Sequence, residues 1–209
     1  MYRTISLYDL INQGIGKDKI MSILSDFSCP LNLDVEHFIH EKAYDFKRVG
    51  LARTYLICAQ PEPHCTYLAA IYSLGQSDVQ LSDDIKPRHK KKMFGTSYPI
   101  GRNVKTLLIG QLAKNYTNGY NKYISGDILM GLIFSRIRDI HILFPSVVTH
   151  IDCKDDEHLK KYYERYGFSL FKKNGDMLIV EPHFISEKNK EKLQNKKANG
   201  WRVMPYSTA

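Results

Sequence analysis

Residues 106–144 read TLLIGQLAK, then NYTNGYNKYISGD, then ILMGLIFSRIRDIHILF: an apolar segment, a polar one and a second apolar one. The first predicts a buried strand over Lys105–Ala113, and the last predicts a helix over about Gly126–Leu143. The polar segment between them, Asn115–Asp127, is rich in Asn and Gly and is too long for a tight turn. It should end at a helix N-terminus, where unpaired backbone N–H groups and the helix dipole attract anions.

Helical and strand-like spacings continue on both sides of this segment. They predict, in chain order, helices over Lys17–Phe27 and Asp34–Lys47 with Asp34 as an N-cap, strands over Thr54–Gln60 and Cys65–Leu74, a strand over Val147–Cys153, a helix over Asp155–Gly167 and final strands in FSLFKK and MLIVEP. Strands that alternate with helices indicate an α/β or α+β fold with a mixed sheet covered on both faces. We expect one domain over residues 1–182 and a basic C-terminal tail over 183–209.

The composition is that of a soluble globular protein, with 209 residues, 43% hydrophobic and 25% charged. The net charge of +8 favours a polyanionic partner such as nucleic acid, or an anionic cofactor; the alternative is a Lys-rich solvated surface. No apolar run approaches the ~20 residues of a membrane span, and the first residues lack the apolar core of a signal peptide. These patterns predict a cytoplasmic protein without membrane contact.

Cysteine and histidine spacings argue against a metal site. The four cysteines form no CxxC pair, so we expect reduced thiols. His37 and His40 lie three apart on a predicted helix, but no third ligand is placed beside them. Neither a G-x-S-x-G elbow nor a P-loop occurs, which excludes the corresponding hydrolases and nucleoside triphosphatases.

Two stretches resemble the GCN5-related N-acetyltransferases (GNAT). QLAK (Gln111–Lys114) is similar to the end of the strand that precedes this family's cofactor loop, and YYERYGF (Tyr162–Phe168) is similar to the family's later helix end. The resemblance covers roughly Thr54–Pro182. It is closest in type to small bacterial and phage acetyltransferases, including toxins that acetylate aminoacyl-tRNA. It implies a mixed, mostly antiparallel central sheet, helices on both faces and splayed central strands.

The resemblance implies acetyl-CoA as cofactor. The backbone of Leu112, Ala113 and Lys114 would pair with the pantetheine arm and polarise the thioester carbonyl. The family's Q/R-x-x-G-x-G/A loop would place its diphosphate-binding positions at Asn121, Lys122, Ile124, Ser125, Gly126 and Asp127. Only the last glycine of that pattern, Gly126, is present. Ile124 takes the place of the first glycine, where a side chain narrows the space for a phosphate.

Tyr163 matches the tyrosine that the family uses as general acid. A phenol is protonated at neutral pH and can donate to a departing thiolate. The alternative is a Tyr packed between helix and sheet with its hydroxyl satisfied. Glu62, His64 and Asp155 are candidate bases by residue type only. An aminoacyl α-amine would need no dedicated base, because its pKa is low.

The basic run Lys86–Lys92 suggests a polyanionic acceptor, with Lys90, Lys91 and Lys92 as candidate substrate contacts. The favoured function is an N-acetyltransferase that acts on a primary amine, of an aminoacyl-tRNA or of a protein. A solvated basic face is the alternative for the run, and a non-catalytic CoA- or nucleic-acid-binding module is the alternative function. Basic surroundings argue against polyamine substrates. A homodimer or an antitoxin partner stays open.

Overall fold

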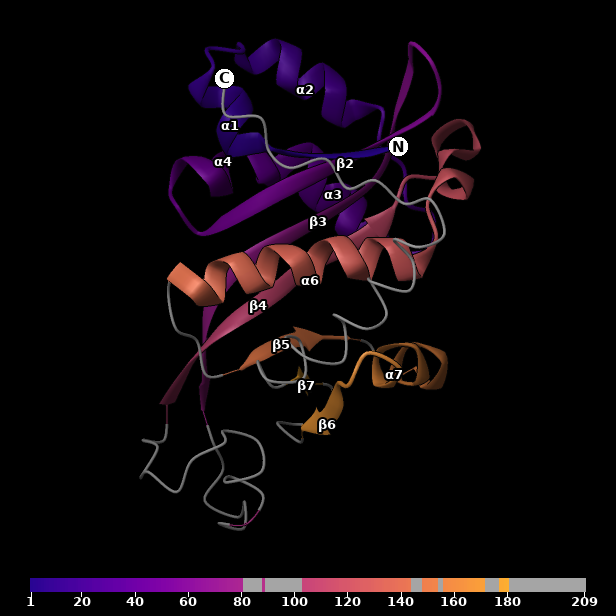
Figure 1. Ribbon diagram of the computed structural model, residues 1–209. Helices are drawn as coiled ribbons and strands as arrows, with labels where there is room; N and C mark the ends of the chain where they lie inside the picture. Colours follow the sequence, from indigo (N-terminus) through magenta and orange to yellow (C-terminus); the bar gives the residue numbers. More distant parts are fainter. Residues whose placement is uncertain (81–87, 89–102, 144–147, 154–155, 172–176, 181–209) are drawn as a thin grey trace. The chain divides into compact units, whose positions relative to one another are not determined.

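The computed structural model describes residues 1–80, 88, 103–143, 148–153, 156–171 and 177–180 (Figure 1). The chain divides into two compact units. Among the described residues, unit 1 contains Met1–Leu74 and Gln111–Ile133, and unit 2 contains those that fall within Gly75–Gly110 and Phe134–Glu191. The expected boundary after Pro182 and the basic tail 183–209 lie outside the described residues.

Unit 1 begins with a strand and a run of helices. Its elements are β1 (Tyr2–Ser6), α1 (Leu7–Asn12), α2 (Lys17–Ser25), α3 (Leu33–His37), the π-helix η1 (Phe38–Lys42), α4 (Ala43–Arg48), β2 (Ala52–Glu62) and the first part of β3 (Cys65–Gln80). The strand order in this unit is β1-β2-β3-β4, and β1 runs antiparallel to β2 with Thr4 opposite Ile57.

Three elements contribute to both units: β3, β4 (Asn103–Lys114) and α6 (Gly126–Leu143). The 3-10 helix η2 (Thr117–Tyr123) connects β4 to α6 within unit 1. Unit 2 adds β5 (Thr149–Asp152), α7 (Glu157–Glu164), β6 (Ser169–Phe171) and β7 (Met177–Val180), in the strand order β3-β4-β5-β7-β6. The β5–β7 and β6–β7 ladders are antiparallel, whereas β4 and β5 are parallel. The mixed, mostly antiparallel α/β architecture predicted from the sequence is confirmed.

The parallel ladder between β4 and β5 is short. It pairs Leu107 with Thr149 and Leu108 with His150, and the Leu107 N–H donates to the Val148 carbonyl at 3.1 Å. Both strands continue beyond these pairs, to Gly110 within unit 2 on one side and to Asp152 on the other. The described ladder therefore ends before either strand does, as expected for strands that splay apart.

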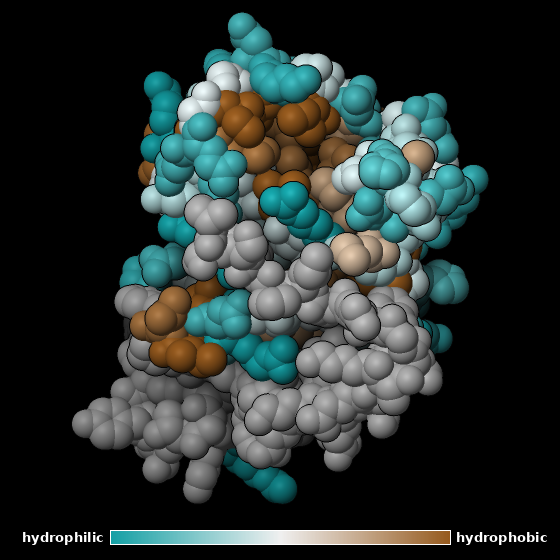
Figure 2. Space-filling view, turned by 45° about the horizontal axis from the view of Figure 1, so that its top comes forward, coloured by the Kyte–Doolittle hydropathy of each residue, from teal (hydrophilic) through white to brown (hydrophobic). Residues whose placement is uncertain are grey.

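The core of unit 1 packs its helices against strands β2 and β3. It is formed by Leu7, Ile20, Leu24, Phe27, Cys29, Val35, Phe38, Ile39, Ala43, Leu56 and Ile71. Partly buried hydrophobic side chains from α1 and α2, among them Leu10, Ile11 and Met21, pack against this cluster. Figure 2 shows hydrophobic residues gathered among hydrophilic ones on the side where α1 and α2 lie. No helix within the described ranges is long and apolar enough to span a bilayer.

The N-terminal residues differ most from the sequence-based expectation. The Tyr2–Ser6 strand and the Leu7–Asn12 helix were not predicted, because each is too short to show a clear period. The expected N-cap at Asp34 is wrong, since Asn32 precedes the helix and Leu33 is its first residue. The single helix predicted over Asp34–Lys47 contains a π-helical turn, which a 3.6-residue pattern does not reveal.

Candidate functional site

The end of β4 carries the first group of expected cofactor residues. Leu112, Ala113 and Lys114 are all partly buried, and Ala113 packs against the core of unit 1. The strand is anchored directly after Lys114, where the Asn115 N–H donates to the Ala69 carbonyl of β3 at 2.8 Å. The backbone at the end of β4 is therefore fixed by a neighbouring strand, which suits a role that depends on backbone groups.

Asn115 is completely buried, and its amide group makes four hydrogen bonds. Nδ2 donates to the carbonyl oxygens of Leu68 at 2.9 Å and Asp26 at 3.2 Å. Oδ1 accepts from the backbone N–H groups of Ser28 at 2.9 Å and Thr117 at 3.0 Å. One side chain thus joins β3, the segment after α2 and the start of η2. A buried amide with all its donors and acceptors used fixes the local backbone geometry.

The polar segment Asn115–Asp127, predicted to be longer than a tight turn, is largely a 3-10 helix, η2. Two of its residues, Asn118 (φ 50°) and Gly119 (φ 72°), are left-handed and kink it. Such angles are tolerated by Gly and, among other residues, best by Asn, which is why this pair can occupy the kink. Asn121 is partly buried and Lys122 is exposed, so the lysine is available to an anion.

The side chain of Ile124 does not occupy the phosphate-binding space that the first glycine of the family's loop would leave open. Its backbone is extended (φ −139°, ψ 129°), and only 1% of its surface is exposed. Ile124 is therefore part of the core, and its side chain cannot contact a ligand. The missing glycine at this position consequently does not place a side chain in front of α6.

The N-terminus of α6 is capped by Ser125. Its Oγ accepts from the Ile128 N–H at 3.2 Å, and its carbonyl accepts from the Leu129 N–H at 3.1 Å. The helix dipole of this 18-residue helix places positive potential at Ser125 and Gly126. Lys122 adds to that potential and the exposed Asp127 in the first turn reduces it.

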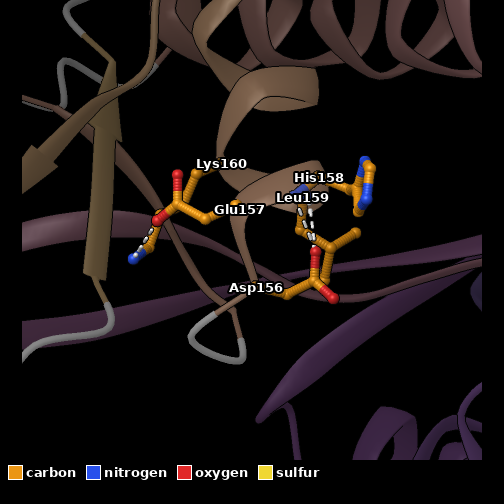
Figure 3. Close-up of polar contacts among 5 residues, drawn as sticks. All are labelled: Asp156, Glu157, His158, Leu159 and Lys160. Atoms are coloured by element: carbon orange, nitrogen blue, oxygen red, sulfur yellow. Dashed lines mark hydrogen bonds and ion pairs between the residues drawn. The ribbon is translucent and has the colours of Figure 1, made fainter.

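The second candidate element, α7, lies in unit 2 and begins at Asp156. Its Oδ1 accepts from the N–H groups of His158 at 2.7 Å and Leu159 at 3.0 Å (Figure 3). These hydrogen bonds, first that of Leu159, lower the pKa of the Asp156 carboxyl. An ion pair between Lys160 and Glu157, 3.3 Å apart, lies on the first turn as well. The helix start is thus specified by an N-cap and a local charge pair.

The end of α7 shows what the YYERYGF stretch does in the fold. Gly167 is left-handed (φ 87°), and its N–H donates to the Glu164 carbonyl at 2.9 Å. The Phe168 N–H donates to the Tyr163 carbonyl, so the two bonds form a Schellman motif. Because this motif stops the helix, α7 is shorter than the predicted Asp155–Gly167.

Tyr163, the expected general acid, is 6% exposed and lies in an aromatic cluster of unit 2. Its ring meets those of Tyr162 at 5.1 Å and Phe168 at 5.6 Å, both edge to face. Burial, with smaller contributions from Tyr162 and Cys153, raises the pKa of Tyr163 well above its usual value. The phenol is therefore protonated over the whole physiological pH range, and its hydroxyl has a proton to donate there.

The remaining candidates are dispersed or lie elsewhere. Glu62 and His64 are exposed at the turn between β2 and β3, where His64 has a left-handed backbone (φ 69°). Asp155 and the run Lys90–Lys92 lie outside the described residues. The Nε2 of His40 is 2.8 Å from the Phe27 carbonyl oxygen. No group of three metal-ligating side chains occurs in the part of the chain that the structure describes.

Solved structures supply the comparison that the sequence does not. No protein-family model matches the sequence, and no curated protein matches it. A tyrosine-to-phenylalanine mutant of KacT is 17% identical, with a TM-score of 0.63 over 89% of this chain and 98% of that one. AtaT complexed with acetyl-methionyl-tRNAfMet is 18% identical, with a TM-score of 0.59 over 78% and 89% of the two chains.

A third structure is an AtaT mutant toxin bound to the C-terminus of the antitoxin AtaR and acetyl-CoA. It is 16% identical, with a TM-score of 0.55 over 78% of this chain and 87% of that one. The chain has the GNAT fold. The resemblance read from QLAK and YYERYGF is thereby confirmed for the fold. At these identities the likeness leaves the chemistry to be argued from the residues.

Sequence reasoning missed two features of this GNAT-fold chain. Asn115 was taken as an ordinary polar loop residue, although it is the buried junction of three segments. Tyr120 and Tyr123 of η2 stack with Tyr67 of β3. Nothing in the local pattern indicates either feature, because each depends on contacts between segments far apart in the chain.

Proposed function

We propose that this chain is an acetyl-CoA-dependent N-acetyltransferase that transfers the acetyl group to a primary amine, with aminoacyl-tRNA as the acceptor. The observation that carries the proposal is the GNAT fold shared with an AtaT bound to acetyl-CoA and with an AtaT complexed with acetyl-methionyl-tRNAfMet. A protein amine is the alternative acceptor. The net charge of +8 supports a polyanionic one.

In this proposal the diphosphate of acetyl-CoA binds at the N-terminus of α6 in unit 1. The Ser125-capped helix N-terminus and the exposed Lys122 supply positive potential there, and the Ile124 side chain is buried in the core. In this proposal Asn121, Ser125 and Gly126 line the diphosphate. The carboxylate of Asp127 reduces the positive potential at this helix end.

The anchored backbone of Leu112, Ala113 and Lys114 has the complementary task. Its groups hold the pantetheine arm as an added strand would, and one N–H donates to the thioester oxygen. The neutral amine attacks the thioester carbon, the tetrahedral intermediate collapses, and the carbon–sulfur bond breaks. The departing thiolate takes the proton of Tyr163, and the proton lost by the amine nitrogen goes to solvent, from which the phenolate is reprotonated. The products are an amide and free CoA.

The test follows labelled acetyl from acetyl-CoA onto charged tRNA, a protein extract and a panel of amines. We expect label on charged tRNA, with transfer weakened by salt and by neutralising Lys90–Lys92 to Gln. Label found only on protein would move the acceptor to a protein amine. Absence of label from every acceptor, together with no thermal stabilisation by acetyl-CoA, would refute the transferase.

The role of Tyr163 has its own test. Tyr163→Phe should lower kcat by about 100-fold or more while leaving acetyl-CoA binding nearly unchanged, because only a proton donor is removed. Tyr162→Phe, one position along the same helix, is the matched control and should keep most of the activity. Equal turnover in both variants would remove Tyr163 from the mechanism.

A further inference from the structure

Three tyrosines of unit 1 form a stacked cluster on its surface, here called the tyrosine platform: Tyr67, Tyr120 and Tyr123. Tyr67 comes from the first part of β3, and the other two come from η2, directly before α6. The Tyr67 ring centroid lies 4.7 Å from that of Tyr120 and 5.4 Å from that of Tyr123, at interplanar angles of 26° and 10°. None of the three side chains is fully buried.

The distances place the rings of Tyr120 and Tyr123 side by side on one face of the Tyr67 ring. Carbon atoms in contact are about 3.5 Å apart or more, so two rings on opposite faces of Tyr67 would be about 7 Å apart or more. The centroids of Tyr120 and Tyr123 are only 6.4 Å apart. The outer face of Tyr67, and those of the other two rings, meet no further aromatic ring in the described part of the chain.

Several contacts hold the platform in place. The Tyr2 hydroxyl donates to the Tyr123 carbonyl at 2.8 Å, and the Asn118 amide lies 3.3 Å from the Tyr120 hydroxyl. Hydrogen bonding to Cys65 raises the pKa of Tyr67 further above neutrality, and a phenol is already uncharged at pH 7. The platform is thus fixed without a ligand, as a preorganised binding surface requires.

A cation lies beside the rings. Lys122 is exposed, and its Nζ is 6.0 Å from the centroid of the Tyr123 ring. Its side chain folds back over Gly119, where an added Cβ would be 3.4 Å from the Lys122 Cε. Flat aromatic faces next to an ammonium group match a nucleotide, whose base stacks and whose phosphate pairs with the cation.

We propose that Tyr67, Tyr120 and Tyr123, together with Lys122, bind the adenosine 3′-phosphate end of acetyl-CoA. This inference rests on the proposed function. Its support is position: Tyr123 lies two residues before Ser125, so the platform directly precedes the helix end assigned to the diphosphate. A base joined to that diphosphate by a single ribose lies within reach of η2. The platform then contributes to donor affinity, and the reacting thioester is bound elsewhere.

The experiment compares acetyl-CoA with acetyl-pantetheine 4′-phosphate, which lacks the nucleotide. The Kd of each donor is measured for the wild type, Tyr67→Ala, Tyr123→Ala and Tyr67→Phe. We expect both Ala variants to raise the Kd of acetyl-CoA about tenfold and to leave the Kd of the truncated donor unchanged. Tyr67→Phe keeps the ring and should bind like the wild type. Tyr8→Ala, an exposed tyrosine of unit 1 outside the platform, is the control for loss of a surface ring.

Adenosine 3′,5′-bisphosphate alone provides an independent measurement, because it should stabilise the wild type against heat more than either Ala variant. If the Ala variants weaken the binding of both donors equally, or leave acetyl-CoA binding unchanged, the proposed role of the platform is wrong. Weakened binding of a single-stranded oligonucleotide in place of acetyl-CoA would contradict that role as well, since the rings would then serve the acceptor. A wild type that binds neither donor refutes the proposed function itself, and the platform falls with it.

Discussion

Phe168 is joined to Tyr163 twice: its N–H donates to the Tyr163 carbonyl at 3.3 Å, and the two rings lie 5.6 Å apart. The left-handed Gly167 between Tyr166 and Phe168 makes both contacts possible. The turn that ends α7 therefore also presses an aromatic ring against Tyr163. The YYERYGF stretch acts as a helix stop and as a support for the candidate general acid.

Gly167→Ala should destabilise the protein by about 1–2 kcal/mol, because a side chain with a Cβ is strained at φ 87°. Urea unfolding measures the change. Gly167→Asn is the control, because asparagine tolerates a left-handed backbone better than alanine. If Gly167→Ala is no less stable than Gly167→Asn, the left-handed turn is not required.

Asn115→Ala should cost about 3 kcal/mol, because it leaves buried backbone groups of β3, η2 and the segment after α2 without partners. Asn12→Ala, an exposed residue at the end of α1, should change stability little. The comparison is made by urea unfolding of both variants.

Asn115→Asp sharpens this test through pH. The carboxylate keeps the acceptor but faces the carbonyl oxygens of Leu68 and Asp26, so it should be protonated more readily than usual. The variant should therefore be more stable, relative to the wild type, at pH 5 than at pH 8. The reverse order would show that the amide nitrogen is not the important group.

Tyr163 should contribute to stability at neutral pH and lose that contribution in alkali. Its folded-state pKa is raised by burial, so the contribution is complete below the unfolded value of about 10 and is lost as pH rises through the folded value. Unfolding curves at pH 7 and pH 10.5 should show a larger loss for the wild type than for Tyr163→Phe. Parallel losses in both proteins would contradict the buried phenol.

The contribution of Asp156 to stability should depend on pH in the opposite direction, being present at neutral pH and lost in acid. Its pKa is lowered by the hydrogen bonds from Leu159 and His158, so its contribution is present above the unfolded value of about 4 and is lost as pH falls through the folded value. Asp156→Ala should lower the Tm at pH 7 by a few degrees. Asp156→Ser keeps a cap but removes the charge, so it should restore much of the Tm and flatten its dependence on acid pH. A Tm in Asp156→Ala equal to the wild type would show that α7 does not need this cap.

The sequence predicted the parts of the fold that repeat a regular pattern. The bounds of α6 agree with the prediction of Gly126–Leu143, because its apolar face runs through 18 residues. The helix that carries Tyr163 and the strand that ends at Lys114 were found as well. The strand at Tyr2–Ser6 was missed because five residues are too few to show a clear period and its hydrogen-bond partner, β2, lies far along the chain.

The candidate site could be predicted only in part from the sequence, because some of its features depend on contacts between distant segments. Ser125 and Lys122 could be named because a capping residue and a cation have local signatures. The direction of the Ile124 side chain depends on an extended backbone at one residue, which no periodicity reports. Asn115 and the tyrosine platform depend on Leu68 and Tyr67 of another strand, so they appear only once the chain is folded.

The kink at Asn118 and Gly119 has a chemical consequence. In an Asn-Gly pair the glycine nitrogen can attack the side-chain carbonyl and expel ammonia, and water then opens the resulting succinimide to aspartate or isoaspartate. Here the Gly119 N–H donates to the Tyr116 carbonyl at 3.1 Å, which holds that nitrogen in the helical turn. Deamidation at this position therefore measures how often η2 opens. A preparation that ages in this way gains a carboxylate three residues before Asn121, next to the cation of the loop.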